Sequence, residues 1–324
     1  MLRSFHFVIG PALVAAALTS GAVASAQTYP EKPITIVVPF AAGSGTDQQA
    51  RSMAQALASE FKVSVVVDNK AGASGFIAAQ YVAKAVPDGY TLLMTTNTTH
   101  AANEHLYKKL PYDPVKDFTP VTLLSKGHML LLVNESSPLK SVSDLIAAAR
   151  KAPGKLNFGS GSSSSRVASE LLKQMAGIEV VNVPYKSNPM AITDLLGGQV
   201  DFMFADAPTA LPQVKSGKLR ALAVSGTRRL AAAPTVPTVE EAGVKGYDMS
   251  YWSAVYLPPK APAAVTARLN EMLVKASSSP AIVAYQAASS GETATSTPEG
   301  LAAFQAAESR KWGHVIRAAG IEAE

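Results

Sequence analysis

Residues 34–47 constrain the fold of this chain more than any other stretch of its sequence. They begin with a β-branched apolar run over 34–38, which is typical of a strand buried on both faces. A loop that contains glycines follows. After the loop, apolar residues recur at the spacing of one helix face, at Ala50, Met53, Ala54, Leu57 and Phe61. The stretch therefore predicts a strand, a small-residue loop and a helix start, whose backbone N–H groups can hold an anion.

An ordinary strand-to-helix turn explains the same residues without a ligand, with Thr46 or Asp47 as the N-cap. A second stretch of the chain favours the anion site. An apolar strand over 156–159 leads into a glycine–serine loop over 160–166, and a helix with its own apolar stripe follows. Two such loops, roughly a domain's length apart, predict two halves of one binding site.

Apolar strands and amphipathic helices alternate along the chain, which predicts parallel sheets in an α/β fold. We expect two α/β domains with a ligand cleft between them. Domain 1 would comprise residues 27–130 plus 252–324, including three helices over 262–320, and domain 2 would comprise residues 131–251. Prolines predict an irregular segment over 101–123, and separate strands are expected at 121–124 and 129–133.

The first residues have the features of a signal peptide. Arg3 precedes an apolar stretch, and Ala24-Ser25-Ala26 is the small-residue pattern that a signal peptidase cleaves. We therefore assign residues 1–26 to a leader and expect export to the periplasm, which suits a chain of this length without cysteine. The net charge of +5 is spread along the chain without a basic run, so we expect no nucleic-acid partner.

The motifs of common enzyme sites are missing from the sequence. Gln48 stands where a dinucleotide fingerprint has its third glycine, and neither a phosphate-binding Gly-Lys-Ser/Thr loop nor a Gly-x-Ser-x-Gly elbow occurs. His100 and His105 are five residues apart, which places them on different faces of a helix, and each is expected to be a hydrogen-bonded loop or surface histidine. We expect a protein without enzymatic activity, cofactor or metal.

Four single residues carry open alternatives. Arg166 is either an exposed arginine without a role or a guanidinium that reaches across the cleft to a carboxylate. Asp206 either caps the helix that begins near Pro208 or accepts a hydrogen bond from a ligand hydroxyl or amine. Phe40 and Tyr185 are either apolar walls of the cleft or part of the core.

Several motifs together resemble the Bug-type receptors of tripartite tricarboxylate transporters. The resemblance extends from about Tyr29 to Ile321. It is carried by Tyr29-Pro30-Glu31-Lys32-Pro33-Ile34, Gly43-Ser44-Gly45-Thr46-Asp47, Pro87-Asp88-Gly89-Tyr90-Thr91-Leu92-Leu93, Val183-Pro184-Tyr185-Lys186 and Pro234-Thr235-Val236-Pro237-Thr238-Val239.

The resemblance implies a periplasmic two-domain binding protein of the Venus-flytrap type, which closes on a small carboxylate by hinge motion. It also implies delivery of this ligand to the membrane permease of a tripartite transporter. Family members grip one carboxylate with backbone amides and hydroxyls of two loops. That role falls here to Ala42, Gly43, Ser44, Gly45 and Thr46 beside Asp47, to Ser160, Ser162, Ser163, Ser164 and Ser165, and to Thr96.

This chain has Arg166 where the family commonly has a histidine. A guanidinium there would favour a second carboxylate, so we expect a dicarboxylate ligand, aliphatic or aromatic such as terephthalate. The alternative function is a periplasmic sensor that presents its liganded form to a signalling partner. A serine hydrolase is disfavoured because no histidine stands in a triad context. We expect a monomer.

Overall fold

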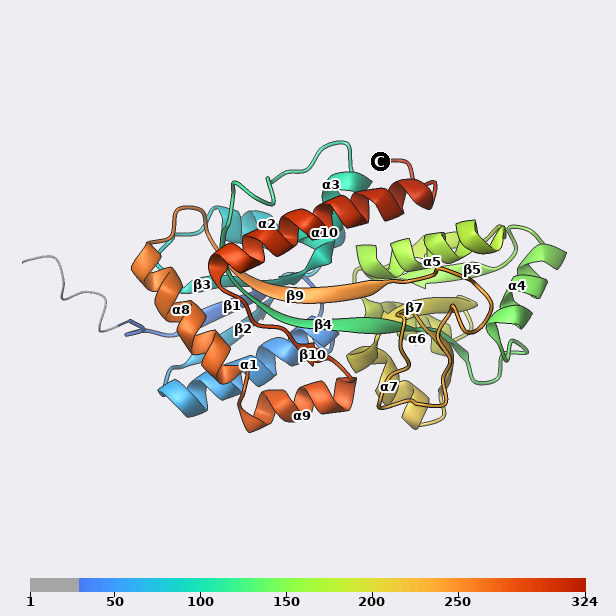
Figure 1. The fold of residues 1–324 in the computed structure, drawn as a ribbon, viewed down its shortest axis with the longest axis horizontal. Coiled ribbons are helices and arrows are strands. Elements are labelled where there is room, and N and C mark those ends of the chain that lie inside the picture. Colours follow the sequence, from blue (N-terminus) through green and yellow to red (C-terminus); the bar gives the residue numbers. More distant parts are fainter. Residues whose placement is uncertain (1–28) are drawn as a thin grey trace, which may run out of the picture.

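The computed structural model describes residues 29–324, and the predicted leader, residues 1–26, lies outside them. The described chain forms two α/β lobes (Figure 1). The 16-residue strand β4 (Thr119–Asn134) runs through both lobes, and the chain returns to the first lobe at β9 (Ser250–Leu257).

The first lobe is built on the sheet order β2-β1-β3-β9-β4. β1 (Ile34–Val38) lies parallel between β2 (Val65–Asn69) and β3 (Thr91–Thr96), and β9 is antiparallel to β3 and β4. The short β10 (Glu292–Thr293) also pairs with β4. The helices of this lobe are α1 (Gly45–Phe61), η1 (Ala73–Gly75), α2 (Phe76–Ala83), η2 (Thr98–Ala102), α3 (Asn103–Leu106), α8 (Ala263–Ala276), α9 (Pro280–Ser289) and α10 (Pro298–Ala318).

The second lobe continues the sheet with β7, β5 and β6. β5 (Asn157–Ser160) lies parallel between β6 (Val181–Pro184) and β7 (Phe202–Asp206), and β8 (Leu219–Val224) pairs with β4. Its helices are α4 (Val142–Lys151), α5 (Ser163–Ala176), α6 (Asn188–Leu196) and α7 (Ala207–Lys215).

Strand β4 changes its partners at one point. His128 pairs with Ser250 of β9 in the first lobe, whereas the next residue, Met129, pairs with Asp206 of β7 in the second lobe. The expected domain limits at 130/131 and 251/252 lie close to this exchange and stay a prediction.

Two sequence-based expectations about this region are wrong. The strands expected at 121–124 and 129–133 form one continuous strand, because different neighbours hold its two halves. The segment expected to be irregular over 101–123 begins in a helical stretch, the π-helix η2 followed by α3. The three helices expected over 262–320 are confirmed as α8, α9 and α10.

Helix α1 forms where its sequence supplies a cap and an apolar face. The Ser44 hydroxyl accepts a hydrogen bond from the backbone N–H of Asp47, and Lys62 ends the helix in the left-handed conformation. Ser44 is therefore the N-cap, and the expected caps Thr46 and Asp47 are wrong because both residues already lie inside the helix. Met53 and Leu57 are buried against β1, which fixes the start of α1 at the carboxyl end of that strand. Among the described residues, none of the helices is long and apolar enough to cross a membrane.

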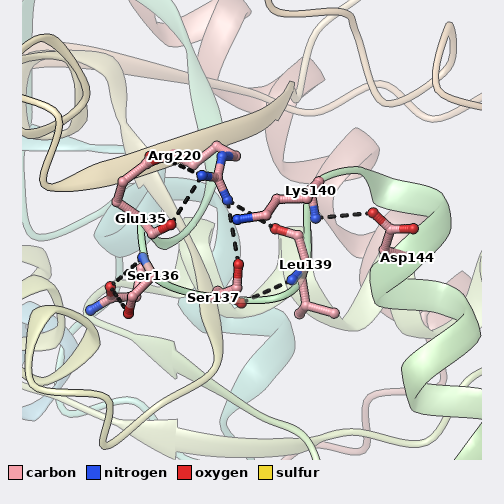
Figure 2. A network of polar contacts seen from close by, with 8 residues as sticks. Glu135, Ser136, Ser137, Leu139, Lys140, Asp144 and Arg220 are labelled. Carbon is pink, nitrogen blue, oxygen red and sulfur yellow. Dashed lines mark hydrogen bonds and ion pairs between the residues drawn. The ribbon is translucent and has the colours of Figure 1, made fainter.

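A polar network fixes the turn after β4 at the outer end of the second lobe. Figure 2 shows Arg220 of β8 reaching across this turn, where it pairs with the Glu135 carboxylate. The guanidinium also donates to the carbonyls of Glu135, at 3.0 Å, and of Leu139, at 3.4 Å. Asp144 accepts from the backbone N–H of Lys140 at 3.0 Å, which ties the same turn to α4.

Candidate functional site

A small pocket lies between the two lobes, and we name it the inner pocket. The loops after β1, β3, β5 and β7 contribute to it, together with β4, β9 and α9. These loops follow the carboxyl ends of strands, which is where open α/β sheets bind ligands. The cavity volume is about 40 Å³. A water needs roughly 10–15 Å³ of such space, so a group of a few atoms such as one carboxylate fits.

The first-lobe side of the inner pocket is the loop before α1. Gly43 adopts φ +81°, which a side chain would strain, and its N–H donates to the Asp47 carboxylate at 2.8 Å. Burial alone would raise the pKa of Asp47, but hydrogen bonds from Arg51, Gly43 and Asn69 hold it below its ordinary value. The ionised Asp47 carboxylate therefore holds the loop before α1 in place without lining the pocket.

The loop leaves backbone donors at the pocket. The N–H groups of Gly45 and Thr46 open helix α1 and have no acceptor among residues 29–324. Both residues line the inner pocket. The positive end of the helix dipole and these free amides favour an anion there.

The second-lobe side repeats this construction at α5. Ser162 and Ser165 form a capping box, and the N–H groups of Ser163 and Ser164 have no acceptor within the described chain. Gly161 must be glycine because a Cβ atom there would lie 2.2 Å from the backbone nitrogen of Asn188. The close approach brings the start of α6 against the start of α5.

Hydrogen bonds across the lobes hold the two sides together. Asn97 donates to the Ser164 hydroxyl at 2.8 Å and accepts from the backbone N–H of Trp252. The Ser163 hydroxyl donates to Asn103 at 2.7 Å. The start of α5 is therefore bonded to Asn97, at the start of η2, and to α3 of the first lobe, and we name this contact of the lobes the closed arrangement.

Acceptor groups also line the inner pocket, close to the loop that carries the Gly45 amide. The Asp206 carboxylate accepts from the Asn188 amide and from the Thr209 hydroxyl, each at 2.5 Å. The other amide atom of Asn188, Oδ1, is buried without a partner in the described part of the chain. Among the described lining residues, Asp206 alone carries a charge.

Two tyrosines also line the inner pocket. The Tyr285 hydroxyl donates to the Gly45 carbonyl at 2.9 Å. Burial, with the nearby Asp206 charge, raises the pKa of both Tyr251 and Tyr285 well above the ordinary value. Both tyrosines are therefore neutral at physiological pH.

A second cavity, which we name the outer hollow, adjoins the inner pocket and has a volume of about 120 Å³. The two cavities share Phe40, Gly161 and Ser162. In the outer hollow the Arg166 guanidinium pairs with the Glu324 carboxylate, with Nη1 and Oε1 2.6 Å apart. The exposed Lys186 also lines it.

The residues expected at the site fall into three groups. Those that line the inner pocket are Phe40, Ser44, Gly45, Thr46, Thr96, Ser162, Ser164 and Asp206. Ser160, Ser163, Arg166 and Tyr185 line the outer hollow. Ala42, Gly43, Asp47 and Ser165 line neither cavity. Which of these residues contact the ligand stays a prediction.

The structure also shows where the residues with open alternatives lie. Asp206 occupies the N-cap position of α7, yet its carboxylate bonds to side chains and lies at the inner pocket. Tyr185 lines the outer hollow and donates to Asp194 at 2.8 Å. His100 is fully buried and stacks on Tyr256, so its expected place in a loop or on the surface is wrong.

Some lining residues of the inner pocket were missed by the sequence analysis. They are Gln49, Met129, Asn188, Pro208, Tyr251, Ser253 and Tyr285. Tyr251 and Ser253 alternate along β9, so a period-two pattern on a returning strand was a usable signal. Tyr285 had no such signal, because it meets Gly45 only through the packing of α9 against α1.

This chain is similar in sequence and in fold to known proteins. Residues 49–321 match the family described as "Tripartite tricarboxylate transporter family receptor". The solved structure of the periplasmic binding protein BugD has a TM-score of 0.87 at 31% identity, and covers 91% of this chain and 100% of that chain. The expected two-domain α/β binding-protein fold is thereby confirmed.

Two further similar structures were solved with a small organic acid. Rpa4515 of R. palustris, solved with adipate, has a TM-score of 0.88 at 36% identity, over 91% of this chain and 100% of that chain. MatC of Rhodopseudomonas palustris, with bound malate, has a TM-score of 0.82 at 30% identity, over 89% of this chain and 100% of that chain. By sequence and by fold, this chain belongs to the receptor family of the tripartite tricarboxylate transporters.

Proposed function

We propose that this chain is a periplasmic receptor that binds a dicarboxylate in its cleft and delivers it to the permease of a tripartite tricarboxylate transporter. One observation carries the proposal. The starts of α1 and α5 approach the inner pocket from opposite lobes, with unpaired N–H groups at Gly45, Thr46 and Ser164 among the described residues, and the unpaired N–H of Ser163 belongs to a residue of the adjoining outer hollow. A carboxylate between these helix starts is stabilised only when the lobes are closed.

The first carboxylate would be bound by neutral dipoles alone. The inner pocket has room for one such group, and the rest of a longer ligand would extend past Phe40 into the outer hollow. There Arg166 offers a planar fork to a second carboxylate. Relatives with bound adipate and malate support this ligand class. Aliphatic diacids and aromatic ones such as terephthalate are candidates.

Isothermal titration of the chain from Gln27 onward tests the proposal with matched acids. Adipate, succinate and terephthalate are compared with hexanoate, propionate and benzoate. We expect the diacids to bind more than about tenfold tighter than their monoacid counterparts. A protein that binds only monoacids, or neither class, would contradict the proposal.

A pair of variants on α5 locates the second carboxylate. Arg166→Ala is expected to weaken adipate binding by more than about tenfold and hexanoate binding only slightly. Lys173→Ala is the matched control, since this lysine pairs with Glu179 and lines neither cavity. Equal losses for both acids would place Arg166 outside the ligand site. Uptake into vesicles that hold the permease subunits tests delivery.

A further inference from the structure

The outer hollow holds a carboxylate that belongs to the chain itself. Glu324 follows α10 of the first lobe, and its side chain pairs with Arg166 of α5 in the second lobe at 2.6 Å. Its backbone is fixed to the first lobe. The N–H of Glu324 donates to the Leu106 carbonyl at 2.9 Å, and its carbonyl accepts from the N–H of Lys108 at 2.7 Å.

We propose that Glu324 is an internal competitor for the second carboxylate of the ligand. In this view the Glu324 side chain occupies Arg166 when the hollow is empty, and a dicarboxylate must displace it. The inference rests on the proposed function and deepens it, because it adds a residue of this chain that sets the preference between diacids and monoacids.

The burial of the two partners supports an exchange. The Arg166 side chain is only 19% exposed, whereas the Glu324 side chain is 58% exposed. A mostly buried guanidinium is costly to leave without an ion-pair partner, and the nearby Glu170, whose ionised form the Arg166 charge favours, forms no ion pair with it among the described residues. An exposed glutamate loses little when its ion pair is broken, because water solvates it. Replacing Glu324 by a ligand carboxylate therefore keeps Arg166 paired and releases Glu324 to solvent.

The charges that line the outer hollow also favour replacement of Glu324 by a ligand carboxylate. With Glu324 in place, the Arg166–Glu324 pair is neutral, and Lys186 is the remaining cation among the described residues that line the hollow. Departure of the Glu324 side chain leaves two cations facing the ligand. The backbone bonds to Leu106 and Lys108 keep the competing carboxylate nearby at a high effective concentration.

Competition of this kind lowers the apparent affinity for every diacid and leaves the inner pocket as it is. If Glu324 occupies Arg166 about four-fifths of the time, removing it raises the affinity for a diacid about fivefold. A monoacid places no group at Arg166, so the ratio of adipate affinity to hexanoate affinity should rise by the same factor.

The test is isothermal titration of adipate and hexanoate into the wild type, E324Q and E322Q. Glu322 is exposed and lies on the same segment as Glu324. E322Q removes the same negative charge, so it controls for the long-range electrostatic effect of losing one charge there. We expect the adipate-to-hexanoate affinity ratio to rise about threefold to fivefold in E324Q and to stay unchanged in E322Q.

The contrary outcomes are distinct. Three results would overturn the proposed competition: an unchanged affinity ratio in E324Q, an equal rise of the ratio in E322Q, or weaker adipate binding in E324Q. The third result would mean that the Arg166–Glu324 ion pair stabilises the closed arrangement. In each of these cases adipate still binds the wild type, and the proposed function stands. A wild type that binds neither acid would overturn the proposed function, and the inference with it.

Discussion

The carboxylate of Asp206, on the second lobe, lies directly against Gly45 on the first lobe. A Cβ atom added to Gly45 would lie 2.2 Å from Asp206 Oδ2. Asp206 has little freedom to move aside, since Asn188 and Thr209 each hold it by a 2.5 Å hydrogen bond. The absence of a side chain at residue 45 is therefore a condition for the closed arrangement.

Gly45→Ala should weaken the binding of every carboxylate by more than about tenfold, because the added methyl group keeps the lobes apart. Alanine is a better helix former than glycine, so the fold should be kept. Titration with adipate measures the effect. Gly197→Ala serves as the control, since the nearest atom to a Cβ there lies at an ordinary 3.6 Å. An unaltered affinity in Gly45→Ala would mean that ligand binding does not need this contact.

The acceptors at Asp206 and Asn188 should favour ligands that carry a hydroxyl group. The unpartnered Oδ1 of Asn188 and the Asp206 carboxylate both accept hydrogen bonds at the inner pocket. We expect malate to bind about threefold to tenfold tighter than succinate. In Asp206→Asn this preference should fall, because a neutral amide oxygen accepts a weaker hydrogen bond than a carboxylate does. Asp68→Asn, which removes the same charge from β2, should retain it, and an undiminished preference in Asp206→Asn would refute this role.

His100 should make the folded state sensitive to acid. Burial lowers the pKa of His100 to about 3, from an ordinary value of 6.5. Because the unfolded chain takes up this proton more readily, the stabilisation is complete above the unfolded pKa. It is lost as the pH falls toward about 3, at a slope of about 1.4 kcal/mol per pH unit.

Urea unfolding between about pH 6 and pH 4 measures this slope. His100→Gln should flatten the pH dependence of the unfolding free energy relative to the wild type. His314→Gln, at an exposed histidine, should leave it unchanged. Parallel curves for the wild type and His100→Gln would show that His100 is protonated without loss of the fold.

Arg220 should support the stability of the second lobe without affecting the ligand. It pairs with Glu135 and bonds to carbonyls of the turn after β4, and its side chain is 22% exposed. Arg220→Ala should lower the free energy of unfolding by about 1–3 kcal/mol. Lys116→Ala, at a side chain 85% exposed, should change it little. A loss of adipate affinity in Arg220→Ala would show that this turn also affects the cleft.

The sequence was most informative where local chemistry decides the structure. Ser44 and Ser162 both cap helices after buried strands, and these local patterns predicted the loops that line the inner pocket. The residues that make up each of these patterns lie within a few positions of one another in the sequence. Such patterns also give the order of strands and helices, since hydrophobic periodicity is itself local.

Contacts made only in the folded chain could not be predicted in the same way. Tyr285 reaches Gly45, and Glu324 reaches Arg166, between residues far apart in the sequence. His100 follows a run of threonines that is typical of a loop, and only its stacking on Tyr256 explains its burial. Such pairings depend on which elements pack together, and no short pattern encodes them.

The exchange of partners within β4 has an evolutionary consequence. Both ends of the described chain belong to the first lobe, so the second lobe is an insertion with one entry at His128–Met129 and one exit before Ser250. The loop before α5, Asn188, Arg166 and Asp206 all lie inside that insertion. Two crossovers in the gene at these positions would transfer the second-lobe lining of the inner pocket as one unit, while the amides of α1 stay in the recipient.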